Sequence, residues 1–285
     1  MKRVTMLFLG ASPLFACGGE DHDHAPGDHQ EPVAIQFSAL VGDRPFACGQ
    51  TYQGVGTSQS TLEPLDFKLY IHDPQLIRSN GERVPLALIQ DGVWQRERVS
   101  LLDFEDGTGL CQTGSPGIHT TIDGLAPDFG DYVGVELSIG LPPEMNHLDA
   151  ATAPAPLSAP GMWWSWSGGF KYLRLDAKTR GNAAYYLHLG ATDCEGTPAT
   201  GFSCQAGNVP KVVLMGFDMG RSQVKIDVAR LWSGVDLDAQ IDGVTDFVPG
   251  CMSFSGDPEC PAVFQKLGLA FGASAAGEQS AFEVQ

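Results

Sequence analysis

Short segments in which apolar and polar residues alternate recur along most of the chain. Within 66–72, Phe67, Leu69 and Ile71 fall on one face, and 132–139 has aliphatic residues at every second position. A repeat of two residues is the spacing of side chains on one face of a β-strand. Similar runs predict further strands over 33–40, 118–122, 170–175, 185–189, 211–217 and 224–231.

Clusters of glycine, proline, aspartate and asparagine separate these strands, as turns do in sheets. The Ser-Gly-Gly turn at 167–169 predicts a hairpin between 162–166 and 170–175. A short helix is expected over 262–269, and 141–161 is the longest loop, rich in proline and alanine. The expected fold is therefore all-β, an antiparallel sandwich or barrel with long loops.

The first residues have the organisation of an export signal. A short basic start precedes an apolar stretch too short to span a bilayer, and residues 14–17 are Leu-Phe-Ala-Cys. A leucine and then a small residue before a cysteine is typical of a lipoprotein cleavage box. We expect 1–16 to be a signal peptide and Cys17 to carry a lipid in the bacterial cell envelope. An ordinary secretory signal with a chance cysteine is the alternative; Gly18 favours the outer membrane, by resemblance to bacterial sorting rules.

An acidic, histidine-bearing segment follows Cys17. Residues 17–32 carry His22, His24 and His29 among aspartates and lack apolar periodicity, so they are expected to form a disordered tether. Such a segment could take up divalent metal weakly, but a solvated linker is the simpler interpretation. The remainder, 33–285, is expected to form one β domain. The net charge of −17 argues against nucleic acid or anionic lipid as a partner.

Six cysteines remain once the lipidation site is set aside, and an even number in an exported chain favours disulfides. Proximity along the chain predicts the pairs Cys194–Cys204, Cys251–Cys260 and Cys48–Cys111. Six cysteines allow fifteen connectivities, so this pairing rests on proximity alone. A zinc site is the competing use of these residues, but no Cys-x-x-Cys pair is present.

Four histidines lie in the expected β domain. His72 ends a strand, His147 lies in the long loop, His188 lies within a strand, and His119 is the fourth. A single histidine is more often structural than a ligand. Several histidines at the strand ends and loops of one scaffold favour a metal site more strongly, and imidazole suits both copper and zinc. The ligand chemistry alone does not decide between these two metals.

The segment 161–172 holds three of the five tryptophans, and Trp164 and Trp166 fall on one face of the predicted hairpin, as core residues would. It belongs to a longer motif: Asn146-His147-x-Asp149, Ala-Pro-Leu at 155–157, and Met162-x-Trp164-Ser165-Trp166-x-x-Gly169-Phe170-Lys171-Tyr172. Accompanying motifs are Asp66-Phe67-Lys68-Leu69-Tyr70-Ile71, Leu101-Leu102-Asp103-Phe104 with Cys111, and His188-Leu189-Gly190 before Cys194 and Cys204. Over about 33–235, these motifs resemble the MbnP family.

That resemblance implies a function. Members of the family are secreted or lipid-anchored β proteins of the bacterial envelope, linked with copper and methanobactin systems. They pair with a di-haem protein of the MbnH type, similar to cytochrome c peroxidases, which oxidises a tryptophan to kynurenine. By resemblance, His147 and His188 are the first candidate copper ligands, His72 is the third, and Trp164 and Trp166 are the candidates for oxidation. The cysteine-bearing stretch after residue 250 has no counterpart in the resemblance.

Two other function classes stay open. An enzyme would need a recognisable reactive constellation, and the sequence has no Gly-x-Ser-x-Gly or His-Glu-x-x-His motif and no blue-copper spacing of cysteine, histidine and methionine. A structural or adhesion lipoprotein would use the tryptophans as core. The favoured interpretation is a copper-binding envelope lipoprotein that is the substrate of its haem partner and not an enzyme.

Overall fold

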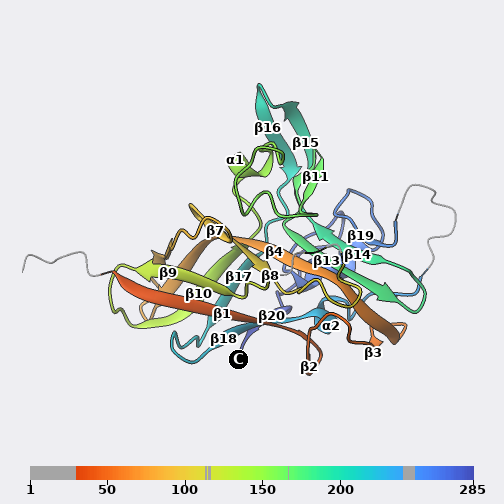
Figure 1. The fold of residues 1–285 in the computed structure, drawn as a ribbon, viewed down its shortest axis with the longest axis horizontal. Helices are drawn as coiled ribbons and strands as arrows, with labels where there is room; N and C mark the ends of the chain where they lie inside the picture. Colours follow the sequence, from red (N-terminus) through yellow and green to blue (C-terminus); the bar gives the residue numbers. More distant parts are fainter. Residues whose placement is uncertain (1–29, 113, 115–116, 166, 240–247) are drawn as a thin grey trace, which may run out of the picture.

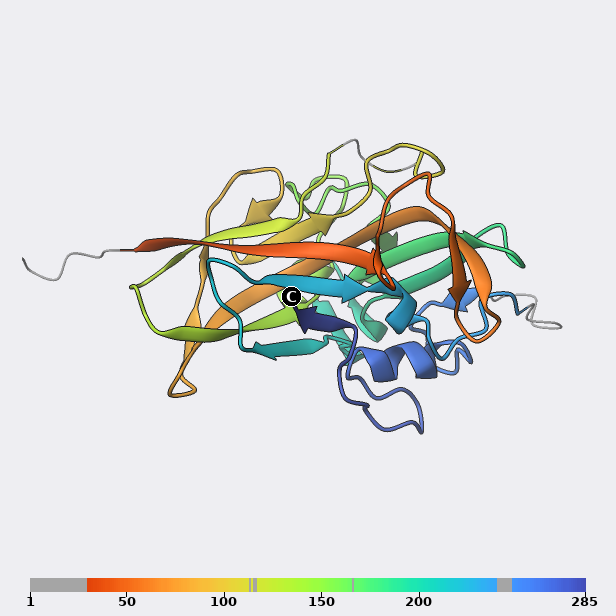
Figure 2. The same cartoon turned by 90° about the horizontal axis from the view of Figure 1, so that it is seen from below.

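Two packed β-sheets make up most of the structure (Figures 1 and 2). The computed structural model describes residues 30–112, 114, 117–165, 167–239 and 248–285. The smaller sheet pairs, in order, β20 (Phe282–Val284), β18 (Gln223–Asp227), β1 (Glu31–Val41), β9 (Thr121–Ala126) and β6 (Ala87–Leu88), with β2 (Arg44–Pro45) on β1. The larger sheet pairs β17 (Lys211–Met215), β10 (Tyr132–Ile139), β4 (Ser60–Arg78), β13 (Leu173–Thr179), β14 (Tyr185–Leu189) and β19 (Gly250–Cys251).

Shorter elements complete the fold. The larger sheet also includes β3 (Tyr52–Val55), β5 (Arg83–Pro85), β7 (Gln95–Arg96) and β8 (Val99–Asp103). Two separate hairpins are β11 (Trp163–Ser165) with β12 (Gly169–Phe170), and β15 (Thr192–Thr197) with β16 (Gly201–Ala206). The helices are α1 (Pro143–Asn146), α2 (Val228–Leu231) and α3 (Cys260–Lys266). No helix in the described part of the chain is long and apolar enough to cross a membrane.

The central strand β4 is buried on both of its faces. Phe67, Leu69 and Ile71 lie in the hydrophobic core, as their alternation predicts. Lys68 and Tyr70, on the opposite face, are equally inaccessible to water. The Tyr70 hydroxyl donates to the Pro156 carbonyl at 3.0 Å, so the long loop covers this second face. The segment thus combines an apolar side with a buried polar side.

The predicted all-β class is confirmed, and the described strands form a sandwich and not a closed barrel. The sheets are mixed, because β1 pairs with β18 in parallel and β14 pairs with β19 in parallel. Strands 132–139 and 185–189 lie where the alternation placed them. The strand expected over 224–231 instead ends at Asp227, whose carboxylate accepts the Arg230 backbone N–H and caps α2.

Other boundaries differ from the prediction for local reasons. The predicted strand 118–122 corresponds to β9, which begins only at Thr121. The segment 170–175 is divided between β12 and β13, and the helix expected over 262–269 is α3, whose Pro261 lies in its first turn. The long loop contains α1. The hairpin of β15 and β16 was not predicted, since its polar residues carry no apolar alternation.

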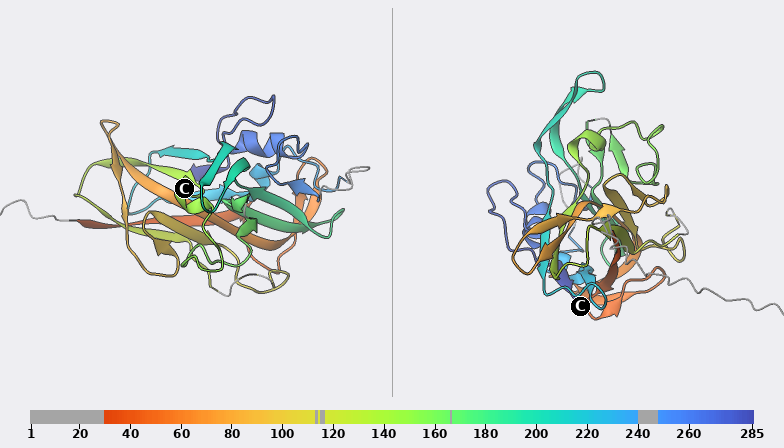
Figure 3. Two further views of the ribbon diagram at one scale, coloured as in Figure 1. Left: turned by 90° about the horizontal axis from the view of Figure 1, so that it is seen from above. Right: turned by 90° about the vertical axis from the view of Figure 1, so that its left-hand side faces the viewer.

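Three disulfides tie these elements together: Cys48–Cys111, Cys194–Cys204 and Cys251–Cys260. They are the pairs that proximity predicted. The second one joins β15 to β16, whose hairpin stands out from the body of the protein beside α1 and β11 (Figures 1 and 3). One of the candidate sites described below, around His147, contacts this hairpin.

Candidate metal centre

His188 is held by a carboxylate inside the larger sheet. It lies on β14, and its Nε2 is 2.7 Å from Oδ1 of Asp176 on the neighbouring strand β13. A carboxylate only accepts, so Nε2 carries the proton and the lone pair is on Nδ1. Nδ1 is buried and has no hydrogen-bond partner in the described structure. A histidine whose one nitrogen is fixed by a carboxylate and whose other nitrogen is free is typical of a metal ligand.

The indole of Trp164 lies against this histidine. Its ring centroid is 5.9 Å from that of His188, in an edge-to-face arrangement, and 5.1 Å from that of Phe254. A glycine at position 190 makes this possible, because a Cβ there would lie 3.1 Å from the Trp164 Cζ3. Trp164 is half-buried. The structure therefore brings one predicted ligand and one predicted oxidation target into contact.

Burial sets the charge of this pair. It lowers the pKa of His188 in spite of the adjacent Asp176 carboxylate, so the imidazole is neutral at neutral pH. Although burial acts against ionisation of Asp176, hydrogen bonds from His188 and Arg174 hold the pKa of that carboxyl below its usual value. A neutral imidazole beside an ionised carboxylate is the state in which His188 can donate a lone pair to a metal.

A buried ionic network extends from Asp176 into the protein. Arg174 bridges Asp176 and Asp66, with Nη2–Oδ2 and Nη1–Oδ2 distances of 2.8 and 3.0 Å. Asp66 in turn lies 2.8 Å from the Lys68 Nζ, which is 2.7 Å from Oε1 of Glu105. The network comprises Asp66, Lys68, Asp103, Glu105, Arg174 and Asp176. Its two cations together contact all four carboxylates, so each buried charge has at least one partner of opposite sign.

Lys171 borders the Trp164 ring on another side. Its Nζ lies 5.9 Å from the ring centroid and donates to the Gly161 carbonyl at 2.7 Å. Burial, assisted by the nearby charge of Arg174, lowers the pKa of Lys171 to about 8. The ammonium group is therefore close to losing its proton at mildly alkaline pH.

This lowered pKa predicts a pH-dependent stability. Above about 8 and below the ordinary value of 10.5, the unfolded chain keeps a proton on Lys171 that the folded chain has released. The free energy of unfolding therefore rises with pH across this window. Compared with Lys171→Met, the wild type should gain roughly 1–3 kcal/mol between neutral pH and pH 10. Urea denaturation of both proteins at the two pH values measures the difference; a pH-independent difference would contradict the assignment.

His147 has different surroundings, at the end of α1. Its ring stacks on Phe202 with a centroid distance of 4.2 Å, and its Nε2 lies 3.3 Å from the Sγ of Cys204. Asn146 donates from Nδ2 to the same Nε2 at 3.2 Å. The side chain lines cavities of about 650 and 290 Å³, so it is accessible from solvent. His147 thus contacts the projecting hairpin, whereas His188 contacts β13 and Trp164.

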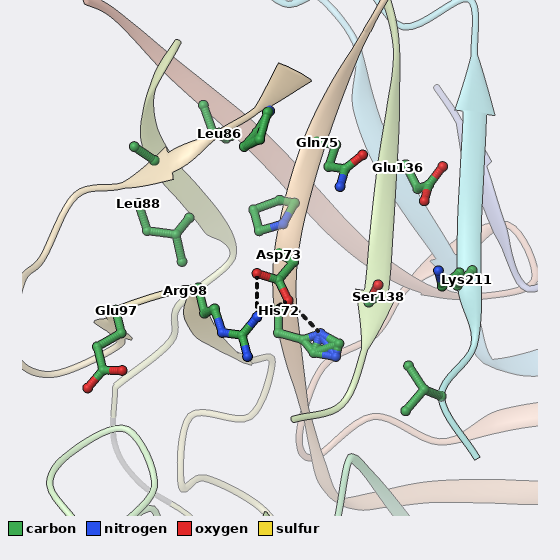
Figure 4. Close-up of a pocket in the computed structure, with 14 residues that line it drawn as sticks. His72, Asp73, Gln75, Leu86, Leu88, Glu97, Arg98, Glu136, Ser138 and Lys211 are labelled. Carbon is green, nitrogen blue, oxygen red and sulfur yellow. Dashed lines mark hydrogen bonds and ion pairs between the residues drawn. The ribbon is translucent and has the colours of Figure 1, made fainter. Parts of the chain in front are cut away.

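His72 borders a third region. It lies on β4 and lines a cavity of about 500 Å³ with Asp73, Arg98 and Lys211 (Figure 4). Asp73 lies between its neighbours: its Oδ2 is 2.9 Å from the Arg98 Nη1 and 3.8 Å from the His72 Nδ1. Burial lowers the pKa of His72 as well. His119 is the remaining histidine of the domain, and its contacts are structural. Its Nδ1 lies 2.7 Å from the Leu101 carbonyl oxygen, and its ring stacks on Trp94.

The candidate residues therefore fall into three neighbourhoods. Among those that the structure describes, His188 and Trp164 contact each other, and His147 and His72 lie in separate environments. Trp166, Cys17 and the tether histidines lie outside the described residues. Neither Asp176 nor the ionic network was among the site residues predicted from the sequence. The feature of the sequence that could have indicated the network is the pair of charged residues Asp66 and Lys68 within a strongly apolar strand.

The comparisons with known proteins agree on one family. The MbnP family model matches residues 30–253. The solved structure of MbnP from Methylosinus trichosporium is similar with a TM-score of 0.79 and 30% sequence identity, over 90% of this chain and 98% of that chain. Comparison with curated proteins gives no match. The region that the family model matches includes the larger sheet, the smaller sheet except β20, and the stretch from Trp164 to His188.

Proposed function

Since the chain belongs to the MbnP family, we propose that it is a copper-binding envelope lipoprotein and the substrate of a di-haem partner. The main support for this proposal is the Nδ1 of His188, which is buried beside the Trp164 indole and has no hydrogen-bond partner in the described structure. A lone pair buried without a hydrogen-bond partner is costly unless something binds it. A metal ion at this position would supply that partner.

The donor chemistry favours copper(I). Neutral imidazoles suit copper, and burial keeps His188 neutral. Its Nε2 hydrogen bond to Asp176 fixes the ring orientation and makes the other nitrogen a better donor. Bound copper(I) would supply a soft, redox-active centre at this place. His147 and His72 lie in other neighbourhoods and remain candidate ligands at positions of their own. Zinc is the competing metal for imidazole donors.

Trp164 is our principal candidate for oxidation. Opening of its indole to kynurenine creates an aniline nitrogen and a carbonyl, both of which can bind metal, whereas the indole offers only an N–H donor. Trp164 is half-buried, so part of its side chain is accessible to solvent, and its ring also contacts His188. A di-haem partner similar to cytochrome c peroxidases would supply the oxidising equivalents. Trp166 is the alternative target.

The N-terminal sequence supports a location of the protein at the membrane. We propose that Cys17 carries the lipid and that 17–32 tether the domain to the outer membrane. The domain would then be accessible to both metal and a secreted haem partner. In this proposal the chain is modified by its partner and performs no turnover of its own.

Copper binding tests the central claim. In the full-length disulfide-bonded protein, His188→Ala should weaken copper(I) binding at least about tenfold, because it removes the preoriented nitrogen. His119→Ala is the matched control, since that ring contacts Trp94 and the Leu101 carbonyl instead. Competition with a copper(I) chelator gives the affinities. Equal binding by wild type and His188→Ala would overturn the assignment and favour the structural or adhesion alternative.

Intact mass and peptide mapping test the oxidation. Co-expression with the active di-haem partner should produce a kynurenine-sized mass change at Trp164, and Trp164→Phe should lack it. The partner with disabled haems serves as the control. A wild-type chain that stays unmodified beside the active partner would contradict this part of the proposal. A mass change at Trp166 would identify Trp166, and not Trp164, as the oxidised residue.

A further inference from the structure

A second group of metal-binding atoms lies on the projecting hairpin. Cys194 on β15 and Cys204 on β16 are directly opposite each other, with their Cα atoms 3.8 Å apart, and their sulfurs form a disulfide. The Nε2 of His147 is 3.3 Å from the Cys204 Sγ. The ligand atoms of all three residues lie within 4.8 Å of one another.

The lone pair of His147 is on the nitrogen that faces this disulfide. The Asn146 Oδ1 accepts the Phe170 backbone N–H at 3.0 Å, which fixes the orientation of the amide. The Asn146 Nδ2 therefore points to the His147 Nε2, 3.2 Å away, and an amide nitrogen only donates. Nε2 must accept, so its lone pair lies at the same nitrogen that approaches the sulfur.

We propose that His147, Cys194 and Cys204 form a metal site that exists only when their disulfide is reduced. The ligand set of two thiolates and one imidazole suits a soft d¹⁰ ion, copper(I) or zinc. The disulfide keeps the site closed, because sulfur atoms bonded to each other are poor ligands. This site is separate from the proposed copper site at His188 and does not depend on it.

The distances suit the ion. Tetrahedral coordination with ordinary zinc–nitrogen and zinc–sulfur bonds places a nitrogen and a sulfur roughly 3.5 Å apart and two sulfurs roughly 3.8 Å apart. The nitrogen–sulfur distance already present is 3.3 Å. Once the 2.03 Å bond is broken, rotation of the two cysteine side chains can separate the sulfurs without moving the strands. A solvent molecule would complete the coordination.

The reduction needs an external two-electron reductant, such as a dithiol. Its two thiols transfer two electrons and two protons to the Cys194–Cys204 bond, giving two cysteine thiols, and become a disulfide themselves. Metal binding then displaces the two thiol protons and leaves the oxidation state of the ion unchanged. The imidazole binds in its neutral form and releases no proton.

Accessibility distinguishes this disulfide from the other two. Cys194 and Cys204 are half-buried on the hairpin that stands out from the body (Figures 1 and 3). His147 lines two cavities beside it. In contrast, Cys251 and Cys260 are almost completely buried, and Cys48, although half-buried, is bonded to the buried Cys111. The groups beside those disulfides are the carboxylates of Glu105 and Asp257, which are harder ligands than an imidazole.

Copper(I) titration of the full-length protein tests the proposal. Mild phosphine reduction, followed by anaerobic removal of the phosphine, should add one equivalent of bound copper(I) and a thiolate-to-copper absorption band. Alkylation and peptide mapping identify the reduced pair. A parallel titration with zinc shows which ion the site prefers.

Three variants make the test specific. The reduction-dependent equivalent should disappear in Cys194→Ser/Cys204→Ser, and should bind at least about tenfold more weakly in His147→Ala. It should persist in His188→Ala, which separates this result from the test of the proposed function. If reduced wild type binds no more copper(I) or zinc than the double serine variant, or if His147→Ala changes neither affinity nor spectrum, the site does not exist as proposed.

Discussion

Replacement of Lys68 by methionine is expected to lower the free energy of unfolding by about 3–5 kcal/mol. Lys68 is completely buried, and its Nζ lies within 2.8 Å of carboxylate oxygens of both Asp66 and Glu105. Methionine preserves much of the side-chain volume but removes the cation. The buried carboxylates then lose a partner that compensates their charge, which costs more than the loss of an exposed ion pair.

The destabilisation should depend on pH. Burial raises the pKa of Asp66, while Arg174 and Lys68 act to lower it. Without Lys68 this pKa rises further, so the folded variant keeps a proton that the unfolded chain has lost. The variant should therefore lose stability as the pH rises from acidic to neutral, and its deficit against wild type should be largest at neutral pH.

Urea denaturation at acidic and neutral pH measures this effect. Lys178→Met is the matched control, because Lys178 pairs with Glu63 at 2.9 Å on the surface and its loss should cost under about 1 kcal/mol. Adding Asp66→Asn to Lys68→Met should restore part of the stability, since it removes one uncompensated charge. A Lys68→Met protein as stable as the Lys178→Met control would show that the network is not what stabilises this face of β4.

The strand pattern was readable from the sequence because apolar residues recur at every second position of several strands. Tyr132–Ile139 and Tyr185–Leu189 are examples in which alternation gave the bounds. Alternation shows which residues share a face of a strand, but it does not show whether the polar face is also buried. In β4 it identified Phe67, Leu69 and Ile71 but gave no reason to expect that Lys68 would also be inaccessible to water. Segment 103–105 contacts Lys68 and the long loop contacts Tyr70, and no local pattern specifies the paths of these two segments.

The candidate site was predicted only in part, because some of its contacts depend on how segments distant in the sequence meet. The family resemblance selected His188 and Trp164, and the structure places them in contact. It could not supply Asp176, because the contact of Asp176 with His188 comes from strand register between β13 and β14 and not from sequence spacing. The proximity of His147 to Cys204 likewise depends on how the α1 loop meets the hairpin.

Asp176→Ala is expected to affect both stability and copper binding, because Asp176 serves two partners. Its Oδ1 accepts from the His188 Nε2 and its Oδ2 lies 2.8 Å from the Arg174 Nη2. Alanine removes both contacts and leaves the buried imidazole N–H without its acceptor, which should cost about 2–4 kcal/mol. The imidazole also loses the contact that fixes its orientation, so copper(I) affinity should fall roughly 10–100-fold.

Asp176→Asn separates the two roles. An asparagine oxygen can still accept from His188, so the ring stays oriented, but the amide lacks the charge that strengthens His188 as a donor and pairs with Arg174. Its copper(I) affinity should therefore lie between those of wild type and Asp176→Ala. Chelator competition at a temperature where urea denaturation shows each variant to be folded gives the comparison. If Asp176→Ala is folded and binds copper(I) as tightly as wild type, then the Asp176–His188 hydrogen bond stabilises the sheet alone and the metal ligand must be sought at another histidine.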